Sequence, residues 1–69
     1  MQFQLVCERE DDGRWIAEIE AIPGVLAYGA SANEAMAKAE VLALRVLAEQ
    51  IEHGEAKPSS ISISLPAAA

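Results

Sequence analysis

Several residue types that carry out chemistry or stabilise small domains are scarce in this 69-residue sequence. The single cysteine, Cys7, cannot form an internal disulfide, so we expect a reduced thiol in a cytoplasmic protein. Five Lys and Arg residues stand against eleven Asp and Glu residues, and the net charge of −6 opposes direct binding to nucleic acid or anionic lipid. No apolar run approaches the roughly 18 residues of a membrane-spanning helix. The composition indicates one small domain that suits a basic protein partner.

The few residues able to act in catalysis each have a structural explanation. His53, the only histidine, lies where a helix is expected to end, and there it complements the helix dipole. Asp11 and Asp12 lie in a tight turn that favours Asp for backbone reasons, and Cys7 alternates with apolar residues as a small buried side chain does. We therefore expect a non-enzyme with no catalytic residue, no metal site and no cofactor, which neither cleaves RNA nor binds duplex DNA.

Alternating apolar residues predict two half-buried strands near the N-terminus, within residues 2–9 and 14–21. Pairing these strands places Arg9 opposite Trp15, as a candidate cation–π partner. The residues expected on the buried face are Phe3, Leu5, Cys7, Trp15, Ala17, Ile19 and Ala21.

The hairpin loop follows from which residues must face the core. A two-residue Asp-Gly loop would set Cys7 opposite Glu18 and place acids on the buried face. A three-residue loop over residues 11–13 pairs Cys7 with Ala17 instead. We therefore predict the longer loop, with Gly13 in a left-handed conformation.

Two further strands are predicted, one on each side of a helix. Residues 22–25, Ile-Pro-Gly-Val, have Pro and Gly where a type II turn requires them, and a third strand follows over residues 25–30. Near the C-terminus, residues 60–65 alternate serine with isoleucine or leucine, which predicts a fourth strand.

A helix is predicted over residues 32–53. Ser31 and Glu34 have the spacing of a capping box, in which the serine side chain accepts from the helix and the glutamate reaches back to the cap. Gly54 is a natural residue just beyond a helix end, and Pro58 prevents any long continuation.

These elements predict an α+β domain of two layers in the order β-β-β-α-β. One helix packs on a four-stranded mixed sheet of strand order 3-2-1-4, with the fourth strand parallel to the first. The domain spans residues 1–65, and residues 66–69 form a disordered tail. The order is similar to part of a ribonuclease-H-like fold. However, Gln4-Leu5-Val6 supplies no acid in the middle of the first strand, where two-metal catalysis would need one.

The predicted helix carries two apolar stripes. The broad stripe, suited to the sheet, comprises Ala35, Met36, Ala39, Leu42, Ala43, Val46 and Leu47. The second stripe has strict four-three spacing and comprises Ala37, Val41, Leu44, Ala48 and Ile51. Because one sheet buries one stripe, we predict a homodimer or larger homo-oligomer in which the second stripe forms the contact. In the alternative, the third strand and the C-terminal segment fold over part of this stripe.

The segments "DDGRWIAEIEAIPGVLAYGAS" and "NEAMAKAEVLAL" together resemble the HicB-like antitoxin family, over nearly the whole chain. That family has an Asp/Gly hairpin, an aromatic strand, a Leu-Pro-Gly-Cys type turn, a Gly-Thr/Ser segment and a helix beginning Glu-Glu-Ala. The chain departs from it in having Ala21-Ile22-Pro23-Gly24-Val25 at the turn and no DNA-binding domain after residue 65. The residues that match are Gly13, Trp15, Pro23, Gly24, Gly29, Ser31, Glu34 and Ala35.

The resemblance implies a non-catalytic protein that binds a small basic ribonuclease toxin of the HicA type and blocks its catalytic histidine and RNA surface. The acidic residues expected on the outer sheet face are either a solvated surface or the toxin contact, and they are Glu8, Glu10, Glu18 and Glu20. A stand-alone oligomeric module with a structural or regulatory role and no toxin partner fits the same sequence.

Overall fold

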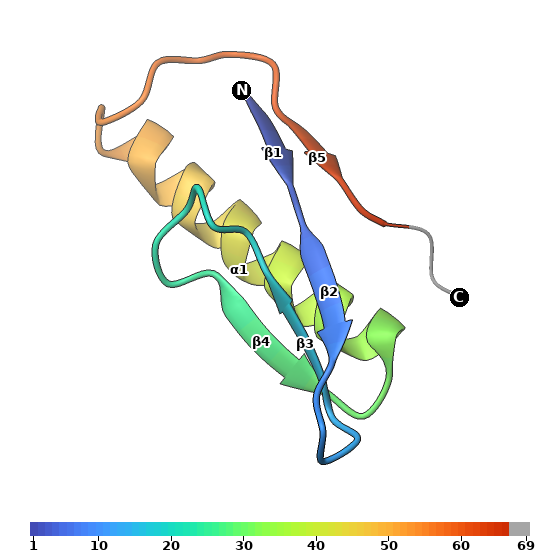
Figure 1. Ribbon diagram of the computed structural model, residues 1–69. Helices are drawn as coiled ribbons and strands as arrows, with labels where there is room; N and C mark the ends of the chain where they lie inside the picture. Colours follow the sequence, from blue (N-terminus) through green and yellow to red (C-terminus); the bar gives the residue numbers. More distant parts are fainter. Residues whose placement is uncertain (67–69) are drawn as a thin grey trace.

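A computed structural model describes residues 1–66 of the chain. One helix lies behind a set of short strands, and the N-terminal strand runs beside the last strand (Figure 1). In chain order, the elements are β1 (Gln2–Gln4), β2 (Val6–Arg9), β3 (Trp15–Glu18), β4 (Leu26–Gly29), α1 (Ala32–Glu52) and β5 (Ser62–Ser64). The predicted α+β class is confirmed.

The predicted single four-stranded sheet of order 3-2-1-4 is wrong. The structure has an antiparallel sheet of order β2-β3-β4 and a separate parallel pair of β1 with β5. The predicted first strand divides at Leu5, whose N–H donates to the carbonyl of Ser64 at 2.9 Å. The division lies where β3 ends, because the pairing of β2 with β3 stops at Val6 and Glu18 and the chain then turns, with the N–H of Ile22 donating to the carbonyl of Ile19 at 3.1 Å. The first strand thus loses its antiparallel neighbour and pairs with β5 instead.

The predicted parallel alignment of the first and last strands is confirmed, with Phe3 opposite Ile63. The last strand is shorter than predicted, spanning three residues, and the apolar residues on either side of it, Ile61 and Leu65, are exposed. Of the predicted tail, Pro66 is exposed and outside any strand, and residues 67–69 lie outside the described part of the chain.

The hairpin and the following turn have the predicted geometry. Cys7 pairs with Ala17, which confirms the three-residue loop, and Gly13 has a φ of 89° in that loop. Gly24 has a φ of 85° in the second turn, which the N–H of Val25 closes by donating to a carbonyl three residues earlier. Both glycines adopt the left-handed conformation that residues with a side chain rarely adopt.

The ends of α1 follow the predicted signals. The Ser31 Oγ accepts from the N–H of Glu34 at 3.1 Å, and Gly54 has a φ of 73° directly after the C-cap residue His53. Among the described residues, the predicted return bond from the Glu34 side chain to the cap is not found, because its carboxylate accepts from Lys38 Nζ at 3.0 Å instead. This bond, with a smaller contribution from the backbone of Ala30, lowers the pKa of Glu34.

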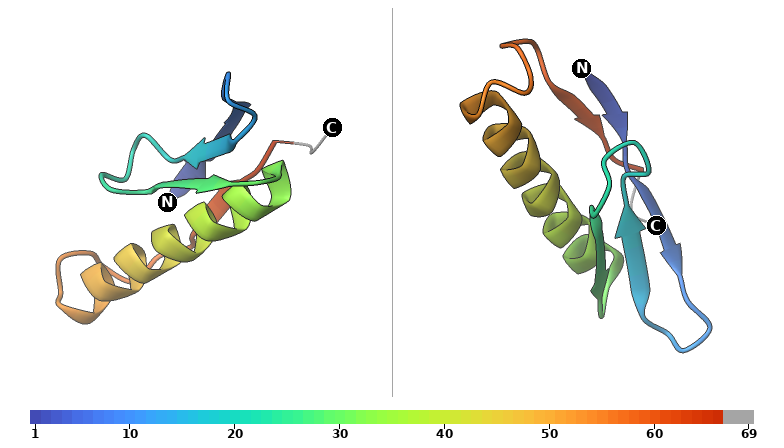
Figure 2. Two further views of the ribbon diagram at one scale, coloured as in Figure 1. Left: turned by 90° about the horizontal axis from the view of Figure 1, so that it is seen from below. Right: turned by 90° about the vertical axis from the view of Figure 1, so that its left-hand side faces the viewer.

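The core forms where α1 crosses β3 and β4, on one face of the antiparallel sheet (Figure 2). Five residues of the predicted broad stripe are buried, and Leu42 and Val46 are half-buried against them, so the prediction for this stripe is confirmed. Leu5, between β1 and β2, belongs to this core and has 1% of its surface exposed. The buried core residues are Leu5, Ala17, Ile19, Ile22, Val25, Ala27, Ala35, Met36, Ala39, Ala43 and Leu47.

Within residues 1–66, α1 does not combine the length and the apolar character that a helix needs to cross a membrane. The structure therefore contains no candidate membrane-spanning helix in its described part.

Candidate protein interface

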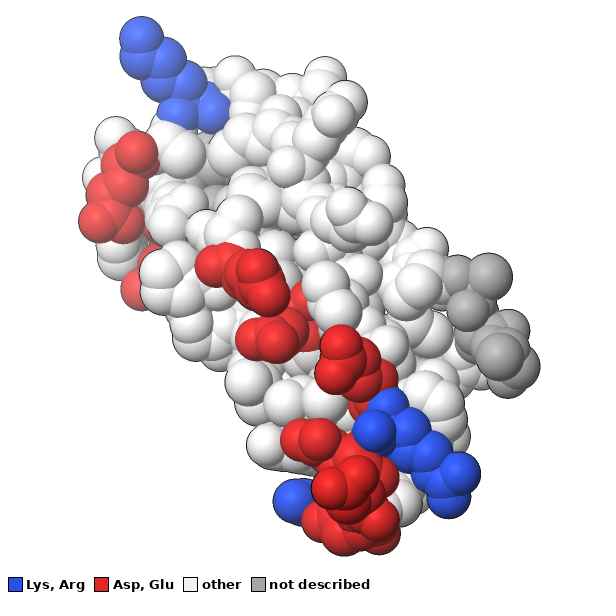
Figure 3. Space-filling view, viewed as in Figure 1, with Lys and Arg blue, Asp and Glu red and all other residues white. Residues whose placement is uncertain are grey.

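The outer face of the β2-β3-β4 sheet lies opposite α1 and is the candidate site. The helix covers the other face, so side chains that alternate with the core residues of these strands point away from it. Figure 3 shows this side of the molecule, where acidic side chains form a diagonal run over the sheet towards the hairpin. The residues on the outer face are Val6, Glu8, Ile16, Glu18, Leu26 and Tyr28.

The strand register orders these side chains into two rows across the sheet. The rows are Val6–Glu18–Leu26 and Glu8–Ile16–Tyr28. Side chains directly opposite each other on one face of an antiparallel pair lie in contact range. Each row therefore places one carboxylate next to two apolar or aromatic side chains. A surface that combines charged and exposed apolar side chains in this way is typical of a protein-binding face.

The structure brings together only part of the predicted acidic set. Glu8 is exposed and Glu18 half-buried within the two rows, and Glu10 lies at the start of the hairpin loop, where its N–H donates to the carbonyl of Arg14 at 2.7 Å. Glu20 is exposed but lies beyond the end of β3. It borders a separate surface hollow of about 490 Å³, lined by Gln2, Phe3, Gln4, Val6, Glu20 and Ala21.

Arg14 adds a cation to the hairpin end of this face. Its guanidinium lies 4.5 Å from the centre of the Tyr28 ring, in a cation–π contact. The backbone N–H and the Nε of Arg14 both donate to Asp12, at 3.0 and 2.7 Å, and these bonds lower the pKa of the Asp12 carboxyl. Arg9 does lie opposite Trp15 in the register, as predicted, but the cation–π contact found in the structure is that of Arg14.

Sequence reasoning missed the apolar half of this face, namely Val6, Ile16, Leu26 and Tyr28. The signal was present, because the correct pairing of Cys7 with Ala17 already fixes which alternate residues point outwards. Leu26 and Tyr28 are 43% and 39% exposed, so they contribute a large share of the accessible apolar surface.

The second stripe of α1 lies on the outer surface of the helix. Val41 and Leu44 are 46% and 50% exposed, Ala37 and Ala48 are also exposed, and Ile51 is half-buried. In the described chain, therefore, neither the third strand nor the C-terminal segment covers most of this stripe. Its role in self-association remains a prediction.

The chemically reactive side chains lie apart from one another. Cys7 is half-buried on the helix-facing side of β2, where burial raises the pKa of its thiol and favours the protonated form. His53 caps the far end of α1, and its Nε2 lies 3.9 Å from Glu52 Oε1. Within residues 1–66, no three His, Cys, Asp or Glu side chains gather in an arrangement that could hold a metal ion.

Comparison of the chain with protein-family models, with curated proteins and with solved structures finds no match. The family suggested by the sequence motifs therefore remains a prediction, and function has to be argued from the surfaces described above.

Proposed function

We propose that this protein is a non-catalytic, HicB-like antitoxin that binds and neutralises a small basic ribonuclease toxin of the HicA type. The observation that carries the proposal is the outer face of the β2-β3-β4 sheet, which α1 leaves uncovered and which combines carboxylates with exposed apolar side chains. Apolar contacts exclude water at such a face, while the carboxylates attract and orient a basic partner.

The charge balance of the whole chain supports a basic partner. A net charge of −6 on 69 residues produces a negative potential that accelerates association with a positively charged protein and repels RNA. Electrostatic attraction of this kind increases the rate at which the chain associates with a basic toxin.

The proposal assigns no chemical step to this chain. Asp12 is held by Arg14 in a tight turn, Cys7 faces the core and His53 lies at the distal end of the helix. These groups are positioned by different elements and serve local structure, so inhibition of the partner occurs by covering its surface.

A second candidate function is a stand-alone oligomeric module with a structural or regulatory role and no toxin partner. The exposed second stripe of α1 favours it, because Val41 and Leu44 offer an apolar strip for a second copy of the chain. Self-association through this strip is compatible with either function, since the strip and the outer sheet face lie on opposite sides of the domain.

The proposed function predicts that a neighbouring reading frame encodes a short basic protein, and that protein is the test partner. Reversing Glu8 and Glu18 together to lysine should slow association with that protein by about tenfold at low salt, because steering depends on the charge of the docking face. The rate for the wild-type protein should also fall as salt rises. Both rates are measured by biolayer interferometry with the basic protein immobilised.

Glu49→Lys combined with Glu52→Lys is the matched control, because both residues are exposed on α1, away from the outer sheet face, and the change in net charge is the same. It should reduce the association rate far less than the reversals on the sheet, since long-range attraction is weakened but the docking face is intact. Rates that are independent of salt and equal for all variants contradict the outer face as the docking surface. Absence of any binding favours the stand-alone module.

A further inference from the structure

The outer edge of β4 presents unpaired backbone groups. In the described chain β4 has a strand on one side only, β3. The N–H of Ile19 donates to the carbonyl of Val25, so the backbone N–H and carbonyl groups of Val25 point towards the β3 side. In an antiparallel pair this orientation alternates along the strand, so Leu26 and Tyr28 direct their N–H and carbonyl groups away from the sheet.

This edge lacks the features with which proteins usually protect a strand edge. Its sequence, Leu-Ala-Tyr-Gly, contains neither lysine nor proline, and neither of these residues flanks it directly. The residues with outward-facing backbone groups, Leu26 and Tyr28, also carry exposed apolar side chains on the outer sheet face. An unprotected edge with apolar surface beside it is a template for pairing with another strand.

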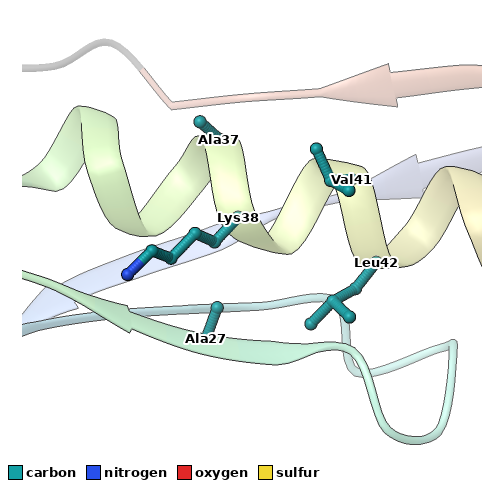
Figure 4. Close-up of a pocket in the computed structure, with 5 residues that line it drawn as sticks. All are labelled: Ala27, Ala37, Lys38, Val41 and Leu42. Atoms are coloured by element: carbon teal, nitrogen blue, oxygen red, sulfur yellow. The ribbon is translucent and has the colours of Figure 1, made fainter.

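A groove continues the apolar surface on the helix side of the same edge (Figure 4). Leu42 reaches from α1 towards β4, where Ala27 lies, while Ala37 and Val41 stand on the outer side of the helix. The groove has a volume of about 440 Å³, and its lining residues are Ala27, Ala37, Lys38, Val41 and Leu42. Both faces next to the β4 edge are therefore available for apolar contact.

Two of the acids near this edge, Asp12 and Glu34, are each paired with a base. Lys38 Nζ lies 3.0 Å from Glu34 Oε1, and Arg14, which covers Tyr28, lies 2.7 Å from Asp12 Oδ2. A second copy of the chain carries the same net charge of −6 and is repelled by the chain as a whole. It meets less repulsion where two of the nearby acids are already matched by bases, and this favours the β4 edge over the rest of the outer face as the place of contact.

We propose that β4 pairs antiparallel with β4 of a second copy, about a two-fold axis through Ala27. In this register Leu26 of each copy lies opposite Tyr28 of the other, so all their outward N–H and carbonyl groups form hydrogen bonds. The same strand supplies both halves of the contact, as two-fold symmetry requires. The two antiparallel sheets become one, the helices lie on the same face, and the groove of each copy opens towards that of the other. This contact does not depend on the antitoxin proposal.

Disulfide trapping tests this register. Ala27→Cys, introduced into a Cys7→Ala background, places the two sulfurs at a pair that lacks hydrogen bonds, where Cα atoms lie about 4.5 Å apart. Mild oxidation with copper phenanthroline should yield a covalent dimer about tenfold faster than Ile61→Cys in the same background, because pairing holds the thiols at high effective concentration. Ile61 is exposed and lies away from β4 next to β5, which makes it the matched control. Reducing and non-reducing gels measure the rates.

Leu44→Cys in the same background separates this contact from one through the second helical stripe. Rapid trapping at Ala27 supports the β4 contact, whereas trapping at Leu44 alone overturns it in favour of the helix. Sedimentation equilibrium of the wild-type protein provides a measurement without variants. A monomer at about 100 μM, far above the dissociation constant of a specific dimer, also overturns the proposal.

Leu26→Pro removes one outward N–H without touching the bonds between β4 and β3, and proline is tolerated at the first residue of an edge strand. It should weaken the dimer by about tenfold or more, while Leu26→Ala, which keeps the N–H, weakens it less. Circular dichroism checks that both variants are folded. Equal dimerisation of two folded variants overturns the assignment of the backbone edge.

Discussion

Replacing Gly29 by alanine should destabilise the fold by about 3 kcal/mol, at the upper end of the range for overpacked sites. Gly29 is buried at the end of β4, directly beneath the first turn of α1. An alanine Cβ would lie 2.6 Å from the backbone nitrogen of Ala35 and 3.0 Å from the carbonyl carbon of Glu34. Backbone atoms cannot rotate away, so the N-terminus of the helix would have to shift and weaken its cap at Ser31.

A loss of this size is large for a domain of this length, whose total stability is on the order of 3 to 10 kcal/mol. Urea denaturation followed by circular dichroism measures it. Gly54→Ala is the control, because a Cβ there meets no atom within 4 Å and only the positive φ is strained, at about 1 kcal/mol. If Gly29→Ala is no more destabilising than Gly54→Ala, the close approach of β4 to α1 is not a feature of the folded protein.

Truncating Leu5 to alanine should also cost about 3 kcal/mol or more, as Leu-to-Ala changes in protein cores do. Leu5 is 1% exposed and lies where the chain passes from the parallel pair to the antiparallel sheet. The substitution keeps the N–H that donates to Ser64, so the loss comes from the side chain and from the cavity that it leaves.

Val6→Ala is the neighbouring control. Val6 is 38% exposed on the outer sheet face, and its truncation should cost less than about 1 kcal/mol. Urea denaturation of both variants gives the difference directly. Equal losses at the two positions would show that the face assignment of this strand is incorrect.

Local signals in the sequence were sufficient for the turns and the helix. The Cys7–Ala17 pairing followed from keeping acids off the buried face, and this fixed the length of the hairpin loop. The start and end of α1 followed from the Ser31 cap and from Gly54, because caps act through hydrogen bonds to neighbouring residues. Such features depend on few residues and are therefore readable from a single sequence.

The division of the sheet could not be predicted in the same way. Phe3, Leu5 and Cys7 alternate without interruption, so the sequence reads as one strand. Whether that strand keeps the same partner depends on where β3 ends and on how the 19–25 segment turns, both of which are tertiary properties. The sequence contains the pattern of each strand but not the point at which its partner changes.

The candidate interface was predicted in part. Charge alone identified Glu8 and Glu18, whereas the apolar residues between them were assigned to no surface. Leu26 and Tyr28 belong to a short strand with alternate residues buried, and their exposure results from α1 covering only the opposite face. The contact of Arg14 with Tyr28 joins the hairpin to β4 and was not evident from sequence spacing.

The pairing of β1 with β5 has a consequence for the order of events in folding. It joins residues sixty positions apart, so the entropy lost in closing that loop is set against only three residue pairs. The β2–β3 hairpin, the turn into β4 and the helix involve far shorter separations and can assemble first. The two ends of the chain should therefore associate last, and pulse-labelled hydrogen exchange should detect protection at Leu5 after protection at Ala17; the reverse order would show that the termini guide folding rather than complete it.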